Sequence, residues 1–192
     1  MRKSQVRILL AISLTLILAH PFLWGQSGGQ TSSAQVKAIY GSAVGYPGSP
    51  VELSFYLTAP DMVGSLVSEI YLPKKLITFD NVRSSNILEA DAQVSMETKV
   101  EDDPQDASRS VLKVSIKNSQ SEKKPIPTGL LAFVIFKISA DAVPGDLKLD
   151  HKASALDAAE AKPIAGTTAE SPVISVYPKG INPLLTCFFF SH

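Results

Sequence analysis

Residues 51–57 of the chain, VELSFYL, alternate between apolar and other side chains. The odd-numbered positions are all apolar: Val51, Leu53, Phe55 and Leu57. Successive side chains of an extended backbone point to opposite faces, so this period of two predicts a strand with one buried face. The turn sequence YPGSP at residues 46–50 precedes it, and APD at residues 59–61 ends it.

The same kind of segment recurs from about Gln35 to Tyr177, and no long stretch has helical periodicity. Strands are predicted at residues 36–40, 51–57, 64–72, 77–79, 94–100, 111–117, 129–138, 147–156 and 173–177. About nine short strands separated by Gly, Pro and Asp turns are typical of an all-β sandwich.

Residues 94–100 and 111–117 predict an antiparallel hairpin with one solvated face. The outward positions form a polar row: Gln93, Ser95, Glu97, Lys99, Lys113, Ser115 and Lys117. This row is the first candidate partner-binding face. The alternative is a solvated sheet surface without a partner, since antiparallel sheets commonly keep one wet face.

Residues 129–138, GLLAFVIFKI, are apolar on both parities and predict a central strand. Lys137 shares a parity with Leu131, Phe133 and Ile135, so we assign this set outward. It forms an alternative, apolar interface, unless the strand is covered on both faces. The faces of residues 64–72 are mixed, and parity alone does not assign the buried side.

The N-terminus is typical of an export leader. Arg2, Lys3 and Arg7 precede an apolar run from Ile8 to Ala19, and small residues follow at 25–27. We expect residues 1–26 to be a signal peptide, 27–34 a linker, and the protein to be secreted or extracytoplasmic, in the periplasm or at the cell surface. An uncleaved leader would be the only membrane attachment.

The C-terminal residues 179–192 form a short apolar tail that contains Cys187 and three consecutive phenylalanines. The apolar part is too short to span a bilayer. A sorting signal, a hydrophobic plug on the sandwich and an incidental end are all compatible with it. The sandwich itself is expected at residues 35–178.

The residue inventory argues against catalysis and against a metal site. His151 is the single histidine between the leader and the terminal residue, and Cys187 is the single cysteine, so a zinc site is not expected. No phosphate-binding glycine loop or nucleophile elbow is present. The acidic run at residues 101–106 lacks the alternate spacing of a calcium loop and is better read as a hairpin turn. No cofactor is expected.

Charge gives no reason to expect nucleic acid as a partner. The full chain has no net formal charge, and without residues 1–26 the remainder is slightly acidic.

The order of segments over residues 35–177 resembles the cohesin domain. GLLAFVIFKI at 129–138 is similar to the family's Gly-x-Leu-Ala-x-x-x-Phe-Lys-Val strand, and PKKL at 73–76 to its Pro-x-x-Leu turn. In full, the family's turn reads aromatic-Asp-Pro-x-x-Leu, and here Leu72 replaces the Asp before Pro73. AVPGD at 142–146 is similar to its Pro-Gly turn, and the stretch 155–164 to the turn before its last strand.

The resemblance implies a nine-stranded jelly roll on which a partner docks flat on one sheet, in the family usually a calcium-loaded dockerin. Gly64 and Leu66 match positions where polar contact residues are expected in the family, which implies a more apolar interface or a different partner. It also implies a non-catalytic protein-docking role in polysaccharide-degrading or cell-surface assemblies.

Two other functions stay open on the same fold. One is a carbohydrate-binding module with a polysaccharide partner, although the tyrosines are scattered along the chain. The other is a structural component of an envelope or secretion complex.

Overall fold

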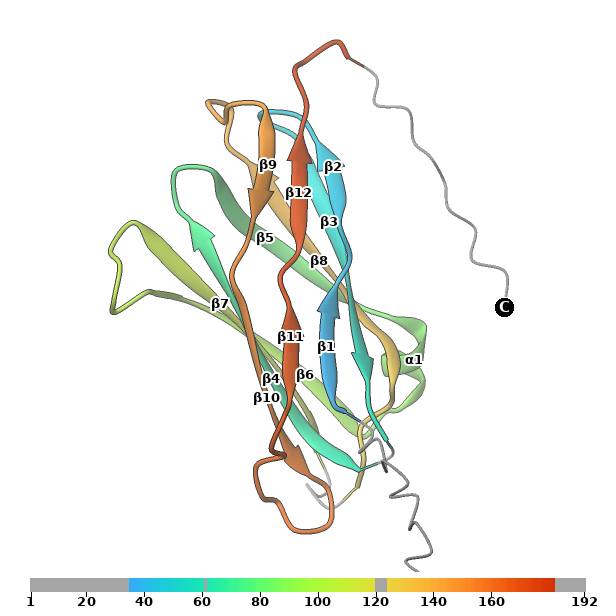
Figure 1. The fold of residues 1–192 in the computed structure, drawn as a ribbon. Helices are drawn as coiled ribbons and strands as arrows, with labels where there is room; N and C mark the ends of the chain where they lie inside the picture. The colour runs from blue at the N-terminus through green and yellow to red at the C-terminus, as the bar shows by residue number, and fades with distance from the viewer. Residues whose placement is uncertain (1–34, 61, 120–123, 182–192) are drawn as a thin grey trace, which may run out of the picture. The chain divides into compact units, whose positions relative to one another are not determined.

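We describe the fold from a computed structural model, which describes residues 35–60, 62–119 and 124–181 (Figure 1). These residues form a β-sandwich with one short helix, α1 (Asn86–Ala90). The strands are β1 (Lys37–Tyr40), β2 (Ala43–Gly45), β3 (Pro50–Thr58), β4 (Val63–Pro73), β5 (Ile77–Ser84), β6 (Val94–Asp102), β7 (Arg109–Asn118), β8 (Gly129–Ile138), β9 (Gly145–Lys148), β10 (His151–Asp157), β11 (Thr168–Glu170) and β12 (Val173–Val176). The predicted all-β jelly-roll sandwich is confirmed.

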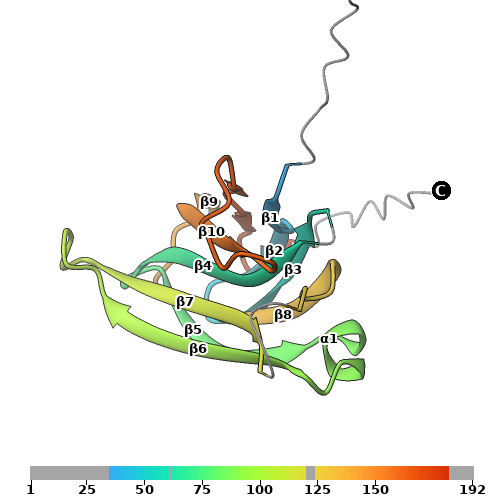
Figure 2. The same cartoon turned by 90° about the horizontal axis from the view of Figure 1, so that it is seen from below.

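The strands form three sheets. The order is β11-β1-β3-β8-β5 in a five-stranded sheet, β10-β4-β7-β6 in a four-stranded sheet, and β2-β12-β9 in a three-stranded sheet. Figure 2 shows the four-stranded sheet with β6 as its edge strand. The pairs β1–β11 and β2–β12 are parallel, and the other pairs are antiparallel. The strands outnumber the nine predicted for two reasons. β2 and β11 have three residues each, too few to show a period of two, and the predicted strand at 147–156 is divided into β9 and β10.

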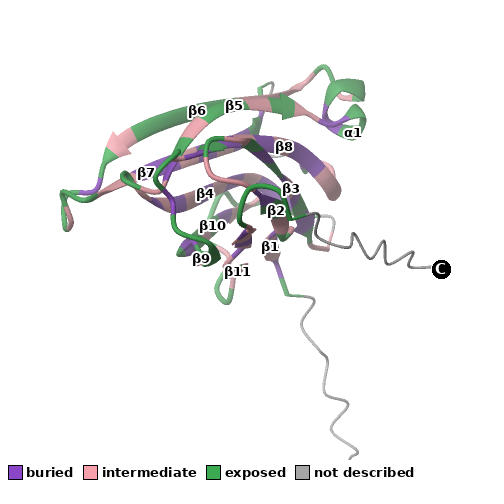
Figure 3. Cartoon of the chain, turned by 90° about the horizontal axis from the view of Figure 1, so that it is seen from above, coloured by how far each residue is buried: buried purple, intermediate pink, exposed green. Residues whose placement is uncertain are grey.

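The core lies between the two larger sheets and is built by the alternation that the sequence shows. Val51, Leu53, Phe55 and Leu57 of β3 are all buried. Strands β4, β7 and β8 bury alternate residues in the same way (Figure 3). Each fully buried side chain of this size contributes about 1.5–3 kcal/mol of hydrophobic stabilisation, so the two-residue period decides the fold.

The turn predicted before β3 is present, and its hydrogen bond and backbone angles fit its sequence. The amide of Ser49 donates to the carbonyl of Tyr46 at 3.0 Å, and Gly48 has φ +82°. Pro47 and Gly48 therefore occupy the two central positions of a turn that needs a positive φ at its second central residue, which is the type II arrangement.

The helix α1 was not predicted, because five residues are too few to show a helical period. It begins at Ser85, whose hydroxyl accepts from the amide of Leu88 at 3.3 Å. In the described part of the chain no helix is long and apolar enough to span a membrane. The predicted leader at 1–26, the predicted linker at 27–34 and the part of the tail beyond Ile181 lie outside the described residues.

Candidate functional site

The four-stranded sheet presents an outward surface whose side chains fall into cross-strand rows. We call the outward side chains of β10, β4, β7 and β6 the outer face. Its rows, in the order β10, β4, β7, β6, are Lys152–Glu69–Lys113–Lys99, then Ser154–Val67–Ser115–Glu97, then Leu156–Ser65–Lys117–Ser95. The polar row predicted on the hairpin therefore occupies the β7 and β6 half of one continuous surface. Its role in binding stays a prediction.

Small side chains occupy the centre of the outer face. The middle row begins with Ser154, Val67 and Ser115, and none of these is longer than valine. Val67 is half-buried among its neighbours. A strip of short side chains lets a partner's backbone or helix come close without displacing long side chains.

Charges of both signs lie along one side of this strip. Lys113 lies 3.2 Å from Glu69 and 3.6 Å from Glu101, and these carboxylates raise its pKa. Hydrogen bonding and attraction from Lys99, with a smaller effect of Lys113, lower the pKa of Glu101. Such exposed pairs contribute little to stability. They do provide charges with defined positions for a complementary partner.

A hollow opens at the end of the outer face beside the β6–β7 turn. Tyr71 lines this hollow, with Arg109 over the ring at 5.2 Å from the ring centroid and Lys152 at 4.9 Å. The contact with Tyr71 raises the pKa of Lys152. Both cations lie over the aromatic ring, so the tyrosine holds them at the rim by cation–π attraction.

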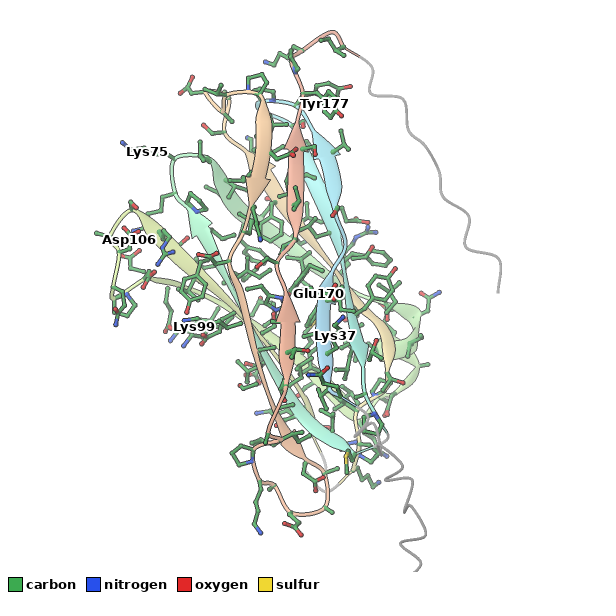
Figure 4. The ribbon with its side chains drawn as sticks, viewed as in Figure 1. Lys37, Lys75, Lys99, Asp106, Glu170 and Tyr177 are labelled. Atoms are coloured by element: carbon green, nitrogen blue, oxygen red, sulfur yellow. The ribbon has the colours of Figure 1, made fainter. Side chains whose placement is uncertain are left out.

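The acidic turn is closed by an arginine. Asp103 is buried, and its carboxylate accepts from Nε of Arg109 at 3.1 Å and from the amide of Gln105 at 2.9 Å. Figure 4 places Asp106 in the same turn, where it pairs with Arg109 at 3.2 Å. The carboxylates of Asp103 and Asp106 are therefore engaged by protein donors. Among the described residues, no group of His, Cys, Asp or Glu is arranged to hold a metal ion.

The prediction of Leu66 as a contact residue is wrong. Leu66 is fully buried and points into the core with Ile70 and Leu72. The outward side chains of β4 are Ser65, Val67, Glu69 and Tyr71, none of which was predicted to be a contact residue. Glu69 could have identified this outward face from the sequence. A charged side chain is rarely buried without a partner, so the odd-numbered positions of the strand are the solvated ones.

The assignment of Leu131 to an outward stripe is also wrong. Leu131 is fully buried, because β8 shifts register beside Phe55 and Tyr56, and its carbonyl accepts from the amide of Ser85 just before α1. Phe133 and Ile135 do face outward on the five-stranded sheet, and both are half-buried. Arg83 lies over Phe133 at 5.5 Å, which covers part of that stripe.

A buried hydrogen-bonded chain joins the two larger sheets. The hydroxyl of Tyr40 (β1) lies 3.1 Å from Oγ of Ser68 (β4), which lies 3.0 Å from Nε2 of His151 (β10). Nδ1 of His151 lies 2.9 Å from the carbonyl oxygen of Glu170 (β11). A carbonyl only accepts, so Nδ1 donates, neutral Nε2 accepts from Ser68, and Ser68 accepts from Tyr40.

The serine–histidine pair in this chain does not make a hydrolytic site. Ser68 has no exposed surface, so its hydroxyl cannot reach a substrate. Burial raises the pKa of Tyr40, which keeps the phenol a neutral donor. The chain of hydrogen bonds is therefore a structural link between the sheets.

We expect this link to make stability depend on pH. Burial lowers the pKa of His151 below its ordinary 6.5, so the unfolded state binds the proton more readily. Stability is then full above pH 6.5 and is lost as pH falls toward the folded-state pKa. Urea unfolding between pH 7 and pH 5 should show this slope in the wild type. His151→Gln should flatten it, and an equal slope in both proteins would contradict the assignment.

Comparisons with known proteins support the fold. No protein-family model matches the sequence, and no curated protein sequence matches it significantly. Among solved structures, the third ScaC cohesin of Acetivibrio cellulolyticus, in complex with the ScaB dockerin, is similar with a TM-score of 0.59 and 15% identity, covering 74% of this chain and 99% of that one.

Two further cohesins show the same likeness. The seventh ScaB type I cohesin of Pseudobacteroides cellulosolvens has a TM-score of 0.57 and 14% identity, covering 82% of this chain and 99% of that one. A non-cellulosomal cohesin of the archaeon Archaeoglobus fulgidus has a TM-score of 0.56 and 18% identity, covering 75% and 92%. The described residues therefore have the cohesin fold, as the sequence resemblance predicted.

Proposed function

We propose that the protein is an exported, non-catalytic docking module that binds a protein partner on its outer face. The observation that carries the proposal is the central strip of short side chains, Ser154, Val67 and Ser115, beside the charged row Lys152–Glu69–Lys113–Lys99, on a cohesin fold. A similar structure carries a dockerin, which supports a protein as the class of partner.

The partner that fits this face is a protein with a narrow apolar ridge and flanking charges of both signs. A dockerin-like partner is one such protein. The archaeal cohesin that is described as non-cellulosomal shows that the fold is not confined to cellulosomes. We propose a polysaccharide-degrading or cell-surface assembly as its setting, on the strength of the predicted leader and the family resemblance.

Direct sugar binding has less support than protein docking. Stacking on a sugar needs an exposed aromatic face. In the described part of the outer face the aromatic side chain is Tyr71, and Arg109 and Lys152 lie over its ring. The carbohydrate-binding and envelope-component alternatives stay untested, and a pull-down on insoluble polysaccharide addresses the first.

Changing Val67 to arginine should weaken partner binding by at least about tenfold, because a long cation would stand in the middle of a strip that the partner must cover. The measurement is affinity capture from the native secretome, with calcium and again with chelator, followed by titration of the captured protein. A dockerin-like partner should be captured with calcium and lost with chelator.

The matched control is Lys137→Glu, an exposed charge change on the opposite sheet. Both variants should keep the wild-type melting temperature, since both positions face outward. Equal capture by wild type and Val67→Arg would show that the outer face is not the docking surface. Capture of polysaccharide alone would favour the carbohydrate-binding alternative.

A further inference from the structure

Strand β6 is a long and open edge of the sandwich. It pairs with β7 over nine residues without a register shift, and its other side faces away from the sheet (Figure 2). The remaining edges are interrupted or short. β5 and β10 carry register shifts, and β2, β9 and β11 have four residues or fewer.

The backbone of β6 has hydrogen-bonding groups directed to this open side. The amide of Ser119 donates to the carbonyl of Gln93, and the amide of Asp103 donates to the carbonyl of Arg109. Antiparallel ladders alternate, so the odd-numbered residues of β6 bond to β7. The N–H and C=O groups of Met96, Thr98 and Val100 therefore point outward, where no described strand pairs with them.

The side chains of β6 do not block an added strand. Natural edges are often protected by a charge on the core-facing side or by a bulge. The core-facing residues of β6 are uncharged up to Asp102, and Val100 is 47% exposed although it faces inward. Figure 3 shows the middle of β6 as exposed. A strand added here would cover apolar surface.

The sequence of β6 is complementary to itself when it runs antiparallel about Thr98, the middle residue of the strand. That register pairs Glu97 with Lys99 of the second copy, twice by symmetry, and Met96 with Val100 of the second copy. Centring the pair on residue 97 instead would place Glu97 opposite Glu97 of the second copy, and centring it on residue 99 would place Lys99 opposite Lys99. Like charges directly opposite are unfavourable, so the charges select the register centred on Thr98.

We propose that the protein forms a two-fold dimer in which β6 pairs antiparallel with β6 of a second copy, centred on Thr98. The two four-stranded sheets then continue into one another, and both outer faces lie on the same side. If the proposed function holds, the dimer presents two docking faces to one partner surface, which raises avidity when the partner is multivalent.

The test is sedimentation across a dilution series, using the full gene expressed with its leader and the exported product. The wild type should associate to a dimer. Glu97→Lys and Lys99→Glu, each alone, should lower the association constant by about tenfold, because each creates two like-charge pairs across the dyad. An equimolar mixture of the two should recover association, since positions 97 and 99 are both basic in one variant and both acidic in the other.

Thr98→Pro is the backbone test. It removes an N–H that points to the open edge and leaves the ladder with β7 intact, so the variant should fold and be monomeric. Lys137→Glu is the matched control and should dimerise like the wild type. A wild type that stays monomeric, association unchanged in Thr98→Pro, or a mixture no stronger than either variant alone would each overturn the proposal. Partner capture by Thr98→Pro tests the docking face separately.

Discussion

Replacing Arg109 with alanine should lower the free energy of unfolding by about 3 kcal/mol, because it leaves the charge of Asp103 buried without its cation. The Asp103 side chain is 2% exposed and lies 2.8 Å from Nη2 of Arg109. Arg109 also pairs with Asp106 and Asp150 and lies over Tyr71. Its loss therefore affects the β6–β7 turn and the hollow together. Urea unfolding monitored by circular dichroism measures the change.

A double-mutant cycle separates the buried charge from the lost packing of Arg109. In an Asp103→Asn background no charge is left without a partner, so Arg109→Ala should cost only about 1 kcal/mol. Lys162→Ala is the matched control, since its ion pair with Glu160 is exposed. It should give no measurable change. The same cost for Arg109→Ala in both backgrounds would contradict the role assigned to the pair.

The sequence predicts structure best where charge and apolarity alternate. The outward assignment of Lys113, Ser115 and Lys117 agrees with the register of β7. The two lysines lie an even number of positions apart, so they mark the same solvated face of the strand. The same logic placed Phe55 in the core. Leu66 was misassigned because it was chosen from the family resemblance and not from the alternation around Glu69, and Leu131 because the register shift in β8 breaks the period of two beside it.

Contacts between distant segments could not be predicted from local pattern. Tyr40, Ser68 and His151 come together because β1, β4 and β10 meet across the sandwich, and no period in the sequence encodes this. The pairing of Asp103 with Arg109 depends on the conformation of one turn. The sequence also does not predict that β10 and β4 lie beside β7 and β6. The half of the outer face on β10 and β4 therefore follows only from the sheet order.

Replacing Phe55 with alanine should lower the free energy of unfolding by about 4 kcal/mol, through lost burial and the cavity that remains. Phe55 has no exposed surface, and its ring stacks on Tyr40 with centroids 4.3 Å apart. That stacking holds the phenol that begins the hydrogen-bonded chain to Ser68 and His151. The substitution therefore loosens the link between the two sheets as well as the core.

Phe133→Ala on the neighbouring strand is the matched control, since the same ring is removed from a half-buried outward position opposite Ser54. It should cost less than half as much. Urea unfolding of both variants at pH 7 makes the comparison. The pH slope assigned to His151 should also shrink in Phe55→Ala, because water entering the cavity would relieve the burial that lowers the pKa of His151. Equal losses for the two phenylalanines would show that the core is not organised around the stacked pair of Phe55 and Tyr40.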